Sequence, residues 1–122
     1  MARNGVLRLV ATLRIGEGKL QTFKELANEA INAAKKNEPG TLTYEWYLSA
    51  DETTCHILEQ YQNSEAILAH VTGEIGTQIL PKILEVAELA GIDVHGIPSP
   101  EAAEVAASFG ARTFSPFGGF TR

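Results

Sequence analysis

Three histidines, one cysteine and several aromatic and acidic side chains are the residues of this chain that could do chemistry near neutral pH. A histidine with a pKa near 6.5 can accept or release a proton at that pH. His70 is the leading candidate for such a base, because it ends a stretch with helical spacing that would hold it over a sheet. The alternative is a structural histidine that hydrogen-bonds a backbone carbonyl.

The other two histidines and the cysteine suggest structural roles. His56 falls on a predicted strand, where it either lines a cavity or contacts a partner subunit, and His95 has a similar place on the last strand. Metal sites usually contain closely spaced ligand pairs, which these widely separated histidines lack, so we expect no metal. Cys55 has no basic neighbour that would activate it, and we expect it to pack in the core.

Aromatic and acidic residues could complete a binding pocket around His70. Tyr44 and Trp46 share one face of a predicted strand, where they either stack on a flat aromatic ligand or belong to the core. Tyr61 ends the next strand and could form a further aromatic wall. Glu59 is expected to be buried, and a buried carboxylate needs a partner, such as an arginine of the first strand or a tyrosine hydroxyl.

The spacing of apolar residues predicts the elements that would position these side chains. Alternation indicates strands, and recurrence every three or four residues indicates amphipathic helices. The expected elements are a strand at 6–15, a helix at 20–37, strands at 41–48 and 54–62, a short helix after Asn63, a longer helix at 75–90 that Pro81 kinks or divides, with Gly91 as its C′ residue, a strand at 92–97, and a helix ending at Phe109 that Ser99 caps.

This order predicts an α+β fold, the ferredoxin-like split βαβ sandwich, in a domain spanning residues 1–98. Residues 99–122 would add a helix and an aromatic tail, which either covers the pocket or embraces another subunit. The helices should cover one face of a four-stranded sheet and leave an apolar patch with residues such as Val10 and Leu58 on the other. A large apolar patch is uncommon on a monomer, so we expect a symmetric homodimer that meets through its sheets.

Composition excludes several classes of protein. A length of 122 residues is enough for one domain, and 10 basic against 15 acidic residues give a net charge of −5, which argues against nucleic-acid binding. No apolar run approaches the roughly 20 residues that a membrane-spanning helix needs. The first residues lack a signal-peptide core, and a single cysteine cannot form an internal disulfide. The expected location is therefore the cytoplasm.

Two segments carry a specific pattern, EPGTLTYEWYL at 38–48 and HILEQYQNSEAILAH at 56–70. An E-P-G turn opens a strand that holds a Y-E pair, the next strand ends in Glu, any residue and an aromatic, and a short helix ends in Ala-His. This pattern resembles the antibiotic biosynthesis monooxygenase family of dimeric α+β barrels, over about residues 5 to 97. The matching residues are Gly40, Leu42, Tyr44, Glu45, Glu59, Tyr61, Ala69 and His70.

The resemblance implies several activities, because this barrel carries cofactor-free oxygenases of quinols and polyketide phenols, haem-degrading enzymes and members without an assigned activity. Leu80 stands where haem-degrading members have a histidine ligand, and Leu9 or Ala11 stands where they have an asparagine. We therefore expect a cofactor-independent monooxygenase of a small aromatic quinol or phenol. In this hypothesis His70 is the base, and Tyr44, Trp46, Glu59, Tyr61 and His56 contact the substrate. The alternative is a non-catalytic homodimer that binds a small ligand or serves in assembly.

Overall fold

The computed structural model describes residues 5–122, so residues 1–4, on which the signal-peptide expectation partly rests, lie outside the described residues. Five strands and five helical segments follow one another along the chain. In order they are β1 (Leu7–Ile15), α1 (Leu20–Asn37), β2 (Thr41–Leu48), β3 (Thr54–Tyr61), α2 (Ser64–Thr72), the π-helical segment η1 (Ile75–Ile79), α3 (Leu80–Ile83), β4 (Ala87–His95), α4 (Pro100–Ser108) and β5 (Arg112–Phe114).

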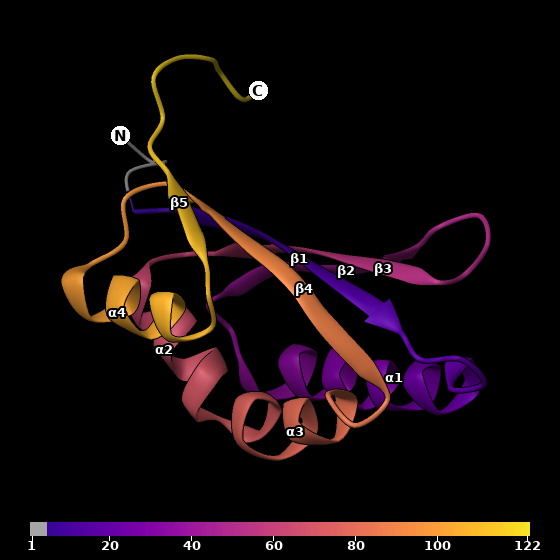
Figure 1. The fold of residues 1–122 in the computed structure, drawn as a ribbon. Helices are drawn as coiled ribbons and strands as arrows, with labels where there is room; N and C mark the ends of the chain where they lie inside the picture. The colour runs from indigo at the N-terminus through magenta and orange to yellow at the C-terminus, as the bar shows by residue number, and fades with distance from the viewer. Residues whose placement is uncertain (1–4) are drawn as a thin grey trace.

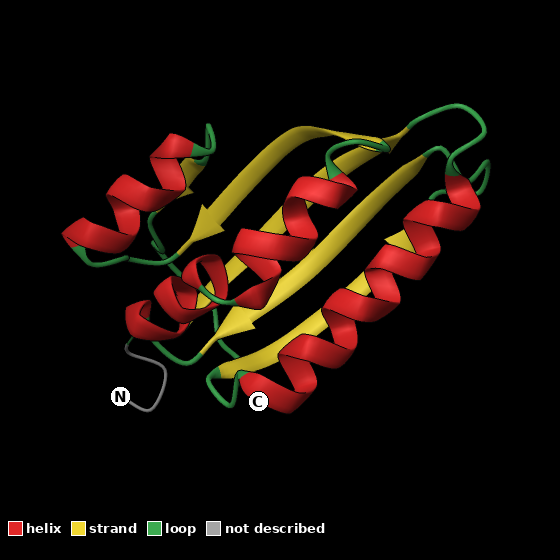
Figure 2. Cartoon of the chain, turned by 90° about the horizontal axis from the view of Figure 1, so that it is seen from below, coloured by secondary structure: helices red, strands yellow, loops and turns green. Residues whose placement is uncertain are grey.

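The strands form one sheet in the order β2-β3-β1-β4-β5, in which the first four strands pair antiparallel and β5 pairs parallel to β4. The helices lie on one side of this sheet and leave its other side uncovered (Figures 1 and 2). This two-layer arrangement confirms the predicted ferredoxin-like α+β fold and the placement of the helices. None of the helices in residues 5–122 is long and apolar enough to cross a membrane.

Alternation in β1 divides its side chains between the two faces of the sheet. Leu7, Ala11 and Leu13 are buried beneath the helices, whereas Arg8 and Arg14 are exposed on the uncovered face, which we call the outer face. The predicted hairpin of β2 and β3 is confirmed, and β3 follows the same alternation. The inner face of the sheet therefore holds the sheet's part of the core and the strand side chains that could line a cavity beneath the helices.

Two helix starts follow their predicted caps. The Asn63 side chain accepts a hydrogen bond from the Ala66 amide at 2.9 Å, and Ser99 accepts one from the Ala102 amide at 3.2 Å. Pro81 lies in the first turn of α3, where its missing N–H is not needed. The expected division of the helical region near Pro81 is therefore confirmed, because η1 and α3 abut at Leu80.

The prediction of one helical region over 75–90 is wrong in its second half, because α3 ends at Ile83 and β4 begins at Ala87. The register between β1 and β4 shifts there: Thr12 is opposite Gly91 but Leu13 is opposite Leu89, so Ala90 is an extra residue. This bulge places Leu89 and Ile92 on the same face at a spacing of three. A strand with that spacing imitates the pattern of an amphipathic helix.

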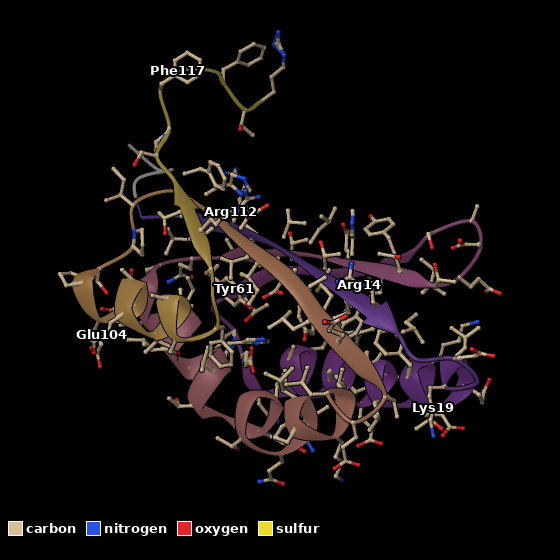
Figure 3. All side chains as sticks on the ribbon, in the orientation of Figure 1. Arg14, Lys19, Tyr61, Glu104, Arg112 and Phe117 are labelled. Carbon is tan, nitrogen blue, oxygen red and sulfur yellow. The ribbon has the colours of Figure 1, made fainter. Side chains whose placement is uncertain are left out.

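The C-terminal tail differs from its expected course. Its first part forms the short strand β5, which makes the sheet five-stranded rather than four-stranded. Beyond β5 the tail runs away from the helices, and Phe117 projects into solvent (Figure 3). Phe117 and Phe120 are 104% and 80% exposed, so these two residues do not cover a pocket of their own chain. Their contact with a second subunit stays a prediction.

Close packing at Gly76 gives a test of the η1 segment. A Cβ atom at this position would overlap the Val71 carbonyl oxygen, whereas a Cβ atom at Gly91 in β4 would meet nothing within 4 Å. We expect Gly76→Ala to lower the free energy of unfolding by about 1–3 kcal/mol, the usual cost of overpacking. Gly91→Ala should change it by less than about 0.5 kcal/mol. Urea denaturation measures both, and equal effects of the two substitutions would contradict the η1 geometry.

Candidate active site

An apolar cavity of about 110 Å³ lies between the inner face of the sheet and the helices. Its floor is formed by side chains of the four long strands, and its walls come from α2, η1, α3 and α4. The main floor residues are Leu9, Ala11, Tyr44, Trp46, Ile57 and Glu59. The His70 side chain enters the cavity from α2. The ionisable side chains among the lining residues are Glu59, His70 and the phenol of Tyr44.

Glu38 holds His70 in place. Its carboxylate oxygen Oε1 lies 2.8 Å from His70 Nδ1 and also accepts a hydrogen bond from the Thr41 hydroxyl at 2.8 Å. Glu38 is the C-cap residue of α1, and His70 lies in the last turn of α2. Because Glu38 engages Nδ1, the hydrogen on that nitrogen points to the carboxylate and the second ring nitrogen, Nε2, is left for other partners.

Glu59 lies on the other side of the imidazole. His70 Nε2 is 4.0 Å from Glu59 Oε1, and the Tyr61 hydroxyl donates a hydrogen bond to that same oxygen. The predicted tyrosine partner of Glu59 is therefore confirmed. The Glu59 side chain is buried, and the Tyr61 ring is fully buried between the sheet and the helices (Figure 3).

The pKa values of the three ionisable groups shift in linked directions. Burial alone lowers the pKa of His70, but the hydrogen bond to Glu38 and the charges of both carboxylates raise it overall. Burial alone raises the pKa of Glu38, yet hydrogen bonds from His70 and Thr41 and the imidazolium charge lower it overall. Burial raises the pKa of Glu59 more than His70 lowers it. The site thus favours a Glu38–His70 ion pair, and it makes Glu59 the harder of the two carboxyl groups to ionise.

Aromatic rings surround the imidazole. Tyr44 and Tyr61 meet the His70 ring edge to face, with ring centroids 5.3 and 5.4 Å away. Trp46 in turn contacts Tyr44 at 5.6 Å and Phe23 of α1 at 5.9 Å. Burial and the neighbouring charges of Glu59 and Glu38 raise the pKa of the Tyr44 phenol, so it keeps its proton.

The structure brings together four of the six predicted site residues as cavity lining: His70, Tyr44, Trp46 and Glu59. Tyr61 lies behind the cavity, where it supports Glu59. His56 is exposed and pairs in register with Thr12 on β1 and Tyr47 on β2, so alternation places it on the outer face. Cys55 is 1% exposed, and burial raises the pKa of its thiol to about 11, as a core role requires.

Sequence reasoning missed two parts of the site. Glu38 was visible only as the first residue of the E-P-G turn, and no local spacing connects it with His70, which lies 32 residues further on. The second part is the wall contributed by α4 and its C-cap residue, where Val105, Ala106 and Phe109 line the cavity. The apolar spacing of these three residues fits one face of a helix, and this was the available signal.

The Glu38–His70 pair is suited to transferring one proton at the edge of the apolar cavity. The carboxylate behind Nδ1 orients the imidazole and stabilises its protonated form, while Nε2 can take a proton from a bound molecule. The apolar walls exclude water and strengthen the electrostatic interactions within the site. These features define a class of small α+β proteins with a carboxylate-supported imidazole over a helix-covered sheet.

Residues 6–75 match the model of the antibiotic biosynthesis monooxygenase family, and the chain belongs to that family. The structure of MupZ from Pseudomonas fluorescens is similar over 98% of this chain and 96% of its own, with a TM-score of 0.83 and 24% identity. A Caulobacter crescentus structure, provisionally named an antibiotic biosynthesis monooxygenase, has a TM-score of 0.67 and 25% identity over 75% of this chain and 88% of its own. No curated protein is significantly similar in sequence.

The Glu38–His70 hydrogen bond predicts how His70 titrates. In Glu38→Gln the neutral amide no longer favours the imidazolium, so the pKa of His70 should fall from its raised value. Glu65→Gln, which changes an exposed residue of α2, should leave the pKa of His70 unchanged. The imidazole resonances of His70 in NMR spectra recorded against pH measure this pKa. An unchanged pKa in Glu38→Gln would show that the hydrogen bond is absent in solution.

Proposed function

We propose that the protein is a cofactor-independent monooxygenase that acts on a small aromatic quinol or phenol. The observation that carries this proposal is the carboxylate-supported imidazole of His70 at the edge of an apolar, aromatic-lined cavity. Membership of the antibiotic biosynthesis monooxygenase family supports the reaction class. The chain's own residues support the choice of a phenol, because they supply a base and flat walls.

The first step is removal of the phenol proton by His70 Nε2. A phenol with a pKa near 10 is only about one part in a thousand ionised at pH 7, so forming the phenolate costs about 4 kcal/mol. A nearby base whose conjugate acid is stabilised by Glu38 offsets this cost, since the proton moves onto an imidazole that already faces a carboxylate. The raised pKa of His70 makes it a stronger base, although a smaller fraction is unprotonated at neutral pH.

The phenolate then supplies the electrons that reduce oxygen. One electron passes to O₂, and the resulting radicals combine to form a carbon–oxygen bond at a ring carbon that carries hydrogen. Loss of that hydrogen as a proton, with cleavage of the O–O bond, leaves a quinone carbonyl and releases the second oxygen atom as water. In sum, phenol and O₂ give quinone and water, and the imidazolium returns its proton to the departing hydroxide.

The cavity walls would hold the substrate ring during these steps. Tyr44 and Trp46 offer an edge and a face to a flat molecule, and the protonated Tyr44 phenol can donate a hydrogen bond to the phenolate. Trp46 Nε1 is buried and has no hydrogen-bond partner among the described residues. Burial raises the pKa of Glu59, which disfavours a second negative charge beside the developing phenolate.

Oxygen uptake tests the proposed reaction and the role of His70. With a panel of quinols, phenols and anthrones, His70→Ala should lower the rate by at least about 100-fold, the usual contribution of a general base. His95→Gln, which changes an exposed histidine on β4, should not. The wild-type rate should rise with pH through the raised pKa of His70, because the unprotonated ring is the active form.

Two outcomes would contradict the proposal. Ligand binding without oxygen uptake for any substrate would favour the non-catalytic small-ligand module instead. A flavin or haem absorbance band in the purified protein would contradict a cofactor-independent reaction.

We also propose a homodimer that meets through the outer face. Val10 and Leu58 pair in register at the centre of this face, next to the half-exposed Tyr47, and charged side chains lie around them. An apolar centre with a polar rim is typical of protein interfaces. The tail extends on the outer-face side of the sheet (Figure 1), where Phe117 and Phe120 could contact the partner.

Light scattering after size-exclusion chromatography tests the dimer. The wild-type protein should have about twice the 13.2 kDa chain mass at micromolar concentration. Leu58→Asp buries a charge at the centre of the interface and should give a monomer. Ile97→Asp alters an exposed residue beyond β4 and should leave the dimer intact. A monomeric wild-type protein at this concentration would overturn the proposal.

A further inference from the structure

We propose that α4 sets the size of the ligand and that Phe109 is the residue that restricts the cavity to a single aromatic ring. This inference rests on the proposed function only for the chemical nature of the ligand. Val105 and Ala106 of α4 and its C-cap residue Phe109 line the cavity, and all three are half-buried. They are apolar and lie at positions that share one face of the helix.

Contacts at both ends hold α4 in place, so that α4 forms a rigid wall of the cavity. At its start, the Ser99 amide donates a hydrogen bond to the Ser64 hydroxyl at 2.8 Å, which ties α4 to the first turn of α2. The fully buried Ala102 packs in the first turn of α4. After α4, Gly110 adopts a φ of 79°, and the chain enters β5, which pairs with β4. A helix held in this way, with apolar side chains towards the cavity, limits the space beside the sheet.

This wall lies outside the part of the chain that defines the family. The family match ends at residue 75, and the Caulobacter crescentus structure covers only 75% of this chain. The structure of MupZ covers 98%. The residues that supply the base, Glu38 and His70, lie within the family match, whereas Phe109 lies beyond it. The extension therefore adds a selective wall to a site whose chemistry it does not provide.

The cavity volume indicates the size of the ligand. An apolar cavity of about 150 Å³ in another protein holds one benzene molecule. The present cavity of about 110 Å³ is smaller, so it accepts at most one ring, and a second fused ring would require a side chain to move. Removing the Phe109 ring would open the cavity at α4, whereas a larger side chain at Ala106 would close it further. These two substitutions change the volume in opposite directions.

Binding of phenol and 2-naphthol, followed by titration calorimetry, tests the wall without any need for turnover. The wild-type protein should bind phenol more tightly than 2-naphthol. Phe109→Ala should bind 2-naphthol at least about tenfold more tightly than the wild type does, because the second ring gains apolar contacts. Phe114→Ala removes the same ring from β5, outside the cavity lining, and should not change the preference. Ala106→Leu should weaken the binding of both compounds.

The results separate this inference from the proposed function. If 2-naphthol binds equally well to the wild type and to Phe109→Ala, or binds to neither, α4 does not limit ligand size. If Phe109→Ala does not fold, an unchanged affinity of Ala106→Leu for phenol overturns the inference and a weakened affinity supports it. If Phe109→Ala changes the ring preference but no substrate gives oxygen uptake, the size selection by Phe109 is supported and the monooxygenase reaction is contradicted. If oxygen uptake occurs but the ring preference does not change, the monooxygenase reaction is supported and the size selection is contradicted.

Discussion

The hydrogen bond between Glu38 and His70 is the constraint on which the site depends, because it joins the end of α1 to the end of α2 above the sheet. The two helices can meet this closely only if the turn between α1 and β2 lies against α2. Gly40 makes that approach feasible, since a Cβ atom there would lie 2.7 Å from the Ala66 Cβ. A glycine in a turn thus sets the orientation of an imidazole 30 residues further on.

The second carboxylate has a cost in stability. Burial raises the pKa of Glu59, so folding favours the protonated form of this carboxyl group. The stability that this preference contributes is present below the pKa that Glu59 has in the unfolded chain, and it is lost as the pH rises through the higher pKa that Glu59 has in the folded protein. The Tyr61 hydroxyl and the nearby His70 charge reduce this cost without removing it. A buried acid that weakens the fold is typical of positions retained for function.

The sequence predicted the layers and most of the site because these depend on local periodicity. Alternation placed Tyr44, Trp46 and Glu59 on one face, and the Ala-His helix end placed His70 above them. Alternation failed in β4, where the extra residue Ala90 breaks the period of two. The three-residue strand β5 is too short to show any period. The partnership of Glu38 with His70 depends on how α1 and α2 pack, which no short segment encodes.

The two faces of the sheet separate the chemistry from the assembly. Every second residue of β1 and β3 faces the helices, and the residues between them form the outer face, so a one-residue slip in register would exchange the two sets. The helical layer is divided in the same way. Glu38 and His70 belong to the segment shared with the family, while α4 belongs to the extension. Because Phe109 contacts the cavity but takes no part in the ion pair, selectivity can change by substitution in α4 while the base keeps its orientation.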